Sequence, residues 1–139
     1  MRFVDTNVLL YFASRSAADV QKSEIACSTV YEGNLALSVQ VLQEFYVQAT
    51  RASRRDPLTH RQAALLIEAW LRFPVQAINS EIFISALSTK ERYRISYWDA
   101  AIIESALAAG CDVILTENLN HGQHYRGVRV VNPFLATTC

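Results

Sequence analysis

Residues 2–12 read Arg-Phe-Val-Asp-Thr-Asn-Val-Leu-Leu-Tyr-Phe: a short apolar run, a polar triplet and a second apolar run. The first run, Arg2 to Val4, predicts a β-strand, and the triplet Asp5-Thr6-Asn7 carries side chains that commonly cap helices. The run from Val8 to Phe12 predicts a helix that begins near Thr6 or Asn7. The chain therefore opens with a strand, a turn and a helix, and an acidic residue lies where the strand ends.

The same alternation continues along the chain. Apolar spacing predicts helices over residues 17–31, 41–49, 60–72, 80–90 and 100–109. Short apolar runs at residues 35–37, 75–78, 112–116 and 128–131 predict strands between them. Strands separated by helices indicate a parallel sheet covered by helices on both faces. We expect an α/β fold in a single domain spanning residues 1–139.

Acidic side chains recur where these strands end. Asp5 follows the first strand, Glu44 lies in the helix after the second, Asp99 begins the apolar helix at 100–109, and Glu117 follows the strand at 112–116. In an open parallel sheet, ligands bind outside the carboxyl ends of the strands, so these acids are expected to converge. Carboxylates gathered in one crevice repel each other and need a cation. Oxygen ligands suit Mg²⁺ or Mn²⁺, and such sites usually act on phosphates.

Composition limits the other possibilities. The 13 basic and 13 acidic residues cancel, so no overall field draws the protein to nucleic acid or to an anionic membrane. Cys27, Cys111 and Cys139 form no CxxC pair, which argues against a disulfide framework, and Cys27 and Cys111 are expected to be small buried hydrophobes. We find no signal-peptide pattern and no apolar run of about 20 residues. The expected location is the cytoplasm, without membrane attachment.

Four segments follow one another along the chain: Val4-Asp5-Thr6-Asn7, Gln40-Val41-Leu42-Gln43-Glu44-Phe45, Trp98-Asp99-Ala100-Ala101-Ile102-Ile103 and Thr116-Glu117-Asn118-Leu119-Asn120-His121-Gly122-Gln123. Taken in this order, they resemble PIN-domain nucleases, most closely the ribonuclease toxins of the VapBC toxin–antitoxin class. The resemblance covers nearly the whole chain, from Met1 to about Pro133. It implies a three-layer α/β/α domain with a short parallel sheet and a Mg²⁺- or Mn²⁺-dependent ribonuclease. It also implies a homodimer and a cognate antitoxin protein as partner.

The predicted site follows from the motifs and the chemistry together. Asp5 and Asp99 are the expected metal ligands, and Glu44, on a longer side chain, is expected to act through water. Asn118 completes the predicted catalytic set. Residues expected to orient carboxylates or to touch the RNA are Thr6, Asn7, Thr116, Glu117, His121, Arg92 and Arg94. Each acid also has a simpler interpretation, because Asp5 and Asp99 can cap helices and Glu44 can be a solvated helix charge.

The chain departs from the family pattern at one position. The fourth acid normally follows Ser or Thr by two residues, and here Asn118 stands at that place after Thr116. Glu117 is adjacent, but neighbouring side chains on an extended segment point to opposite sides. The site therefore carries one charge fewer than the family pattern. A catalytically weakened RNA- or protein-binding module is the alternative function, and the sequence does not separate it from an active nuclease, nor a natural Asn118 from an engineered one.

Local basic clusters are the remaining signal for nucleic acid. Arg51, Arg54 and Arg55, with Arg61 nearby, form the densest one, and Lys90, Arg92 and Arg94 form a second. Because the net charge is zero, such clusters are the local means of attracting a phosphate backbone. A solvated loop explains each cluster equally well. The identity of the RNA is not readable from the sequence.

Overall fold

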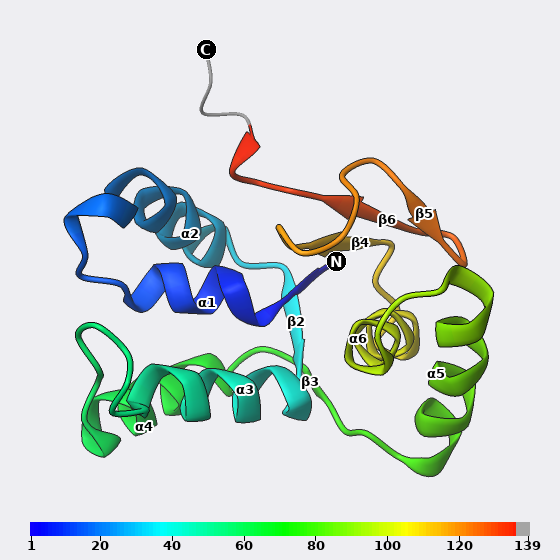
Figure 1. The fold of residues 1–139 in the computed structure, drawn as a ribbon, viewed down its shortest axis with the longest axis horizontal. Coiled ribbons are helices and arrows are strands. Elements are labelled where there is room, and N and C mark those ends of the chain that lie inside the picture. The colour runs from blue at the N-terminus through cyan, green and yellow to red at the C-terminus, as the bar shows by residue number, and fades with distance from the viewer. Residues whose placement is uncertain (136–139) are drawn as a thin grey trace.

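The computed structural model describes residues 1–135 and contains six α-helices and six strands in that range (Figure 1). In chain order the elements are β1 (Arg2–Val4), α1 (Thr6–Ala13), the 3-10 turn η1 (Ala17–Asp19), α2 (Val20–Glu32), β2 (Leu35–Ser38), α3 (Val39–Thr50), α4 (His60–Trp70), β3 (Val75–Gln76), α5 (Ser80–Tyr93), α6 (Tyr97–Ala108), β4 (Val113–Leu115), β5 (His124–Tyr125) and β6 (Val128–Val131).

The sheet has the strand order β3-β2-β1-β4-β6-β5. All neighbours are parallel except β5 and β6, which are antiparallel. Arg2 of β1 is in register with Leu35 of β2 on one side and with Val113 of β4 on the other. The strands β2, β1 and β4 are therefore adjacent and end at the same edge of the sheet.

Helices cover the sheet as a three-layer α/β/α arrangement, with α1 and α2 on one side of the view and α5 and α6 on the other (Figure 1). The helix α6 packs against four strands and is buried from Ala100 to Ala106, so it has no polar face to mark it as amphipathic. The four residues of β2 are all buried, as expected of a strand inside a parallel sheet. Because β2 and α6 are buried, the polar residues at their ends are held against a rigid core.

Short polar side chains cap the N-termini of the helices near the carboxyl edge of the sheet. Ser38 accepts a hydrogen bond from the amide of Val41 to cap α3, and Ser96 accepts one from the amide of Asp99 to cap α6. Asp5 itself caps α1, accepting from the amide of Thr6. The helix α6 thus begins at Tyr97, earlier than the expected residue 100, and Asp99 lies in its first turn.

The antiparallel strand β5 was not expected from the sequence. A two-residue turn, Arg126-Gly127, joins β5 to β6, and both residues have positive φ, 52° and 88°. This is the backbone of a type I′ hairpin turn, which usually carries Asn-Gly or Asp-Gly. Arginine at the first position obscures the pattern. Its side chain pairs with the buried carboxylate of Glu104, which fastens the hairpin to α6.

Two further expectations are corrected by the structure. Cys27 is exposed, and only Cys111 is buried; Cys139 lies outside the described residues. The apolar residues of α1 and α3 pack into one core: Leu9 is buried, and Leu10 and Phe12 contact the core cluster. The 75–78 run forms a strand only at Val75–Gln76. No helix within residues 1–135 is both long and apolar enough to span a membrane.

Candidate active site

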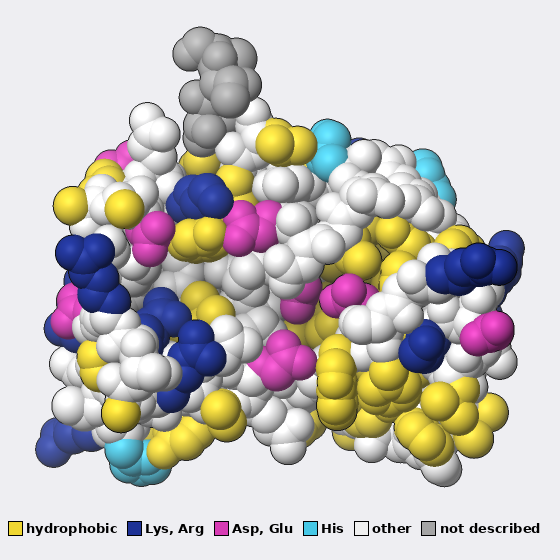
Figure 2. Space-filling view, in the orientation of Figure 1, with side chains coloured by type: hydrophobic (Ala, Val, Ile, Leu, Met, Phe, Trp, Pro, Cys, Tyr) yellow, Lys and Arg dark blue, Asp and Glu magenta, His cyan; other side chains and the backbone are white. Residues whose placement is uncertain are grey.

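The carboxyl edge of β2, β1 and β4 carries the polar groups that define the site. Asp5 follows β1, Thr116 follows β4, and α3 leads away from β2 with Glu44 in its second turn. The backbone amide of Asp5 donates to the carbonyl of Leu115, which ties the two strand ends together at 3.1 Å. Figure 2 shows acidic side chains at the centre of this face of the molecule, between a basic area and an apolar one.

Asp5 is 4% exposed, and both of its carboxylate oxygens accept hydrogen bonds. Oδ1 accepts from the amide of Thr6 at 2.7 Å. Oδ2 accepts from the hydroxyl of Thr116 at 2.8 Å and from the side-chain amide of Asn7 at 3.4 Å. Asn7 also donates to Thr116 at 2.9 Å. Residues 111 positions apart thus fix one carboxylate at the end of β1.

Glu44 is half-buried and held from two directions. Its Oε2 accepts from the hydroxyl of Thr6 at 3.0 Å, and its Oε1 accepts from the side-chain amide of Gln40, one turn earlier on α3, at 2.8 Å. The same Gln40 amide lies 3.3 Å from the carbonyl of Trp98, in the first turn of α6. Gln40 therefore links the helix that carries Glu44 to the helix that carries Asp99.

Burial and mutual repulsion act on the carboxylates together. Burial raises the pKa of Asp5 to about 6; the hydrogen bonds from Thr116 and Thr6 oppose the rise, and the charges of Glu44 and Asp99 add to it. Burial also raises the pKa of Asp99, a hydrogen bond with Ser96 lowers it, and the charge of Glu44 raises it. Three carboxylates from three elements are thus close enough to destabilise one another's charge.

The donor set fits a hard divalent cation by its chemistry. Carboxylate oxygens that repel one another are what Mg²⁺ or Mn²⁺ neutralises. Beside them, Oε1 of Gln40 is buried without a hydrogen-bond partner among residues 1–135, an acceptor suited to a water or a hydrated ion. Within the same residues, no three His, Cys, Asp or Glu side chains are grouped as a ready-made metal site. Asp5, Asp99 and Glu44 as metal ligands therefore stay a prediction.

The segment after β4 separates Glu117 from Asn118. The Glu117 carboxylate accepts from the hydroxyl of Tyr11 at 2.8 Å and pairs with the ammonium of Lys22 on α2 at 3.0 Å. The amide of Asn118 donates to Thr116 at 3.0 Å, and its side chain is exposed. The carboxylate of Glu117 is thus neutralised by Lys22, and the neutral side chain of Asn118 brings no charge to the site.

A cavity of about 390 Å³ opens at this edge of the sheet. Thr6, Glu44, Glu117 and Asn118 contribute to its wall, and so do Arg54 and Asp19. Because the cavity is lined by polar groups from α1, α3 and the segment after β4, it can admit a charged ligand beside Glu44.

The other predicted residues lie in different surroundings. Arg92 and Arg94 are at the end of α5, where Arg92 stacks over Tyr93 at 5.0 Å and borders a separate cavity with Arg126. Arg94 ends α5 in the left-handed conformation, with φ 55°. His121 accepts a hydrogen bond from the amide of Asn132 at 3.0 Å and is exposed. None of the contacts of these three side chains within residues 1–135 joins them to the carboxylates.

Two contacts at the site were missed by sequence reasoning. Gln40 and Glu44 are four residues apart on one helix, a spacing that marks side-chain neighbours and could have indicated the pair. Lys22 pairs with Glu117 across 95 positions, and no local signal in the sequence predicts that contact.

Comparisons with known proteins identify the family and the fold. The chain matches the family model described as the PIN domain over residues 2–126. No curated protein matches it. Among solved structures, it is similar to a toxin–antitoxin complex from Klebsiella pneumoniae, with a TM-score of 0.69 and 20% identity over 96% of this chain and 98% of that chain. It is also similar to VapC20 of Mycobacterium tuberculosis, described as a sarcin–ricin loop cleaving toxin, with a TM-score of 0.65 and 17% identity over 82% and 87% of the two chains.

A third similar structure is DNA-bound VapBC from Salmonella typhimurium, with a TM-score of 0.61 and 16% identity over 93% and 95% of the two chains. Identities this low establish a shared fold and no more. The family match covers most of the chain, and this protein therefore belongs to the PIN domain family.

Proposed function

We propose that this PIN domain is a metal-dependent endoribonuclease, the toxin of a type II toxin–antitoxin pair, which hydrolyses RNA phosphodiester bonds. One observation carries the proposal: Asp5, Glu44 and Asp99, from three separate elements, meet at one edge of the sheet, where burial, and after it the neighbouring carboxylate charges, raise the pKa of Asp5 and of Asp99. Displaced pKa values in a cleft are typical of functional sites, because folding alone gains nothing from gathered like charges.

The residues of the chain have distinct roles in this chemistry. Asp5, Asp99 and Glu44 would hold Mg²⁺ or Mn²⁺, which supplies charge neutralisation at the phosphate and lowers the pKa of the attacking water. Thr116 and Asn7 keep the Asp5 carboxylate in one orientation. Such fixed orientation matters because a misplaced ligand group costs rate even when affinity survives.

The partner and the oligomeric state belong to the same proposal. Solved structures with this fold include toxin–antitoxin complexes, which supports a cognate antitoxin as partner. We propose a homodimer as well, with exposed apolar residues available for its interface on α5 (Phe83, Ile84, Leu87) and at the start of α6 (Trp98) (Figure 2). The proposed place of action is the cytoplasm, where thiols such as those of Cys27 and Cys111 stay reduced.

A catalytically weakened binding module is the second candidate, favoured by a specific observation. Asn118 supplies no charge, and Glu117 beside it is paired with Lys22. The site thus depends on three carboxylates. An active enzyme and a silent module differ in one measurable property, which is metal-dependent cleavage of RNA.

The decisive experiment incubates the purified protein with bulk RNA in Mg²⁺, in Mn²⁺ and in chelator. We expect cleavage with either metal, none with chelator, and none from Asp99→Asn. The exposed Asp112→Asn is the matched control, because it removes the same charge outside the site and should keep full activity. Activity retained by Asp99→Asn would refute the assignment of the site, and no cleavage by the unmodified protein with either metal would favour the binding module.

A further inference from the structure

A second cavity, of about 820 Å³, adjoins the cavity of about 390 Å³ that Glu44 and Glu117 line, which we call the carboxylate cavity. It lies between the segment that connects α1 to α2 and the segment that connects α3 to α4. Arg54 and Asp19 line both cavities, so the two spaces share a wall. The volume falls in the range of about 300–1,000 Å³ that is usual for sites that take up small molecules.

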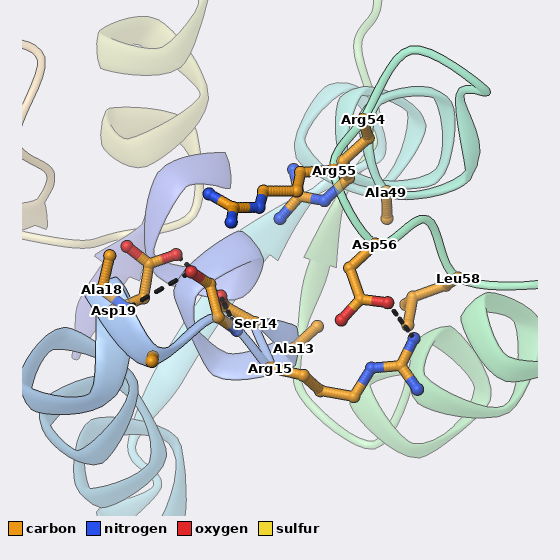
Figure 3. Close-up of a pocket in the computed structure, with 12 residues that line it drawn as sticks. Ala13, Ser14, Arg15, Ala18, Asp19, Ala49, Arg54, Arg55, Asp56 and Leu58 are labelled. Carbon is orange, nitrogen blue, oxygen red and sulfur yellow. Dashed lines mark hydrogen bonds and ion pairs between the residues drawn. The ribbon is translucent and has the colours of Figure 1, made fainter.

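The charged groups around this second cavity are unevenly paired. Arg15 and Asp56 form an ion pair at 3.5 Å, and Asp19 accepts a hydrogen bond from Ser14 at 2.7 Å. Arg54 and Arg55 have no ion pair or side-chain hydrogen bond with any other of residues 1–135. Figure 3 shows their side chains extending from the α3–α4 connection into the cavity, toward Ser14 and Asp19.

Two neighbouring guanidinium groups without a carboxylate partner among the described residues favour an anion. Arg54 is half-buried and Arg55 is exposed, so the pair is open to a ligand yet held at the cavity wall. Guanidinium groups bind phosphate through paired N–H donors, which makes arginine the common choice for such contacts. Because Arg54 also borders the carboxylate cavity, a phosphate held there would lie beside the phosphate undergoing cleavage.

We propose that Arg54 and Arg55 form a binding subsite for the phosphate backbone of the RNA, on one side of the bond that is cut. The proposal rests on the function proposed above and adds the path of the substrate. Net charge is zero for the chain, so RNA affinity must come from local clusters. Of the predicted basic clusters, the one with Arg54 borders the carboxylate cavity, whereas Arg92 borders a different cavity.

The test measures RNA binding without cleavage. A short, end-labelled single-stranded RNA of mixed sequence is titrated with protein in chelator, and fluorescence anisotropy is recorded at several salt concentrations. The double variant Arg54→Gln with Arg55→Gln should bind roughly tenfold more weakly, and the slope of log affinity against log salt should fall by about 0.7 for each lost phosphate contact.

The matched control is Arg51→Gln with Arg61→Gln. It removes the same charge from the same region, but neither residue lines either cavity. We expect its affinity and salt slope to stay close to those of the unmodified protein. Equal loss in the control and the double variant, unchanged affinity in the double variant, or no RNA binding by the unmodified protein would each overturn the proposal.

Unchanged RNA affinity is also the result expected if the arginines instead serve an acidic segment of a protein partner. Because the assay needs no catalysis, failure of the proposed nuclease activity would appear separately, in the cleavage assay with Mg²⁺ or Mn²⁺. Far-ultraviolet circular dichroism checks the folding of each variant, and the side chains of Arg54 and Arg55 form no ion pair within residues 1–135 that the fold would lose.

Discussion

Replacing Asp5 with Asn should stabilise the metal-free protein at neutral pH and destabilise it in acid. Burial and the charges of Glu44 and Asp99 raise the pKa of Asp5 from 3.8 to about 6. At about 1.4 kcal/mol for each pKa unit, the ionised carboxylate destabilises the folded state by about 3 kcal/mol at pH 7. Asn removes that charge but loses the long bond from Asn7 and the short one from the Thr116 hydroxyl, together worth about 1 kcal/mol. The expected net gain at pH 7 is about 2 kcal/mol.

The sign of the pH dependence follows from linkage. The folded-state pKa of Asp5 lies above the unfolded value, so the folded protein binds the proton more tightly. The free energy of unfolding therefore falls as pH rises from about 4 to about 6. Below about pH 4 the carboxyl is protonated in both states, its penalty disappears, and only the lost hydrogen bonds remain. There, Asp5→Asn should be less stable than the unmodified protein by about 1 kcal/mol.

Urea unfolding in chelator, followed by circular dichroism at a series of pH values from about 3.5 to 7, measures both effects. Asp112→Asn, at an exposed aspartate, serves as the control and should change little across the range. The reasoning is refuted if Asp5→Asn gives no added stability at pH 7, or if its difference from the unmodified protein does not shrink and change sign as pH falls.

Three further changes probe the groups around the carboxylates. Asn118→Asp should raise Mn²⁺ affinity and cleavage, roughly tenfold for each 1.4 kcal/mol of added attraction that survives desolvation. Glu117→Gln should leave Mn²⁺ affinity and cleavage nearly unchanged, because Glu117 is bound by Tyr11 and Lys22. Isothermal titration with Mn²⁺ and the RNA assay compare the two variants. A larger effect of Glu117→Gln than of Asn118→Asp would place Glu117 at the ion. Gln40→Leu should lower kcat roughly tenfold with little loss of stability, because the Glu44 carboxylate loses its hydrogen bond from Gln40 and is free to turn. Single-turnover cleavage measures the rate, and urea unfolding measures the stability. An unchanged kcat would show that the Gln40 contact does not matter for the reaction.

Local sequence determined much of this protein. Each strand that leads into a helix of the site ends where an apolar run gives way to a capping residue, so the chain itself marks Asp5 and Ser38 as helix starts. Parallel strands with helices between them also place Asp5 and Glu44 at one edge of a sheet. These features are predictable because caps and periodicity depend on residues only a few positions apart. The hairpin turn at Arg126 was not predicted, because its arginine is held by the carboxylate of Glu104, which is distant in the sequence.

Tertiary structure alone decided which charges are available for chemistry. Glu117 and Asn118 are neighbours in sequence. The Glu117 carboxylate nevertheless pairs with Lys22, 95 positions away, whereas Asn118 is a neutral part of the cavity wall. The rise in the pKa of Asp5 likewise requires burial at the sheet edge and the approach of Glu44 and Asp99. Electrostatic interactions depend on distance and on exclusion of water. Both are set by packing between segments far apart in the chain, so no pattern within a segment reveals them.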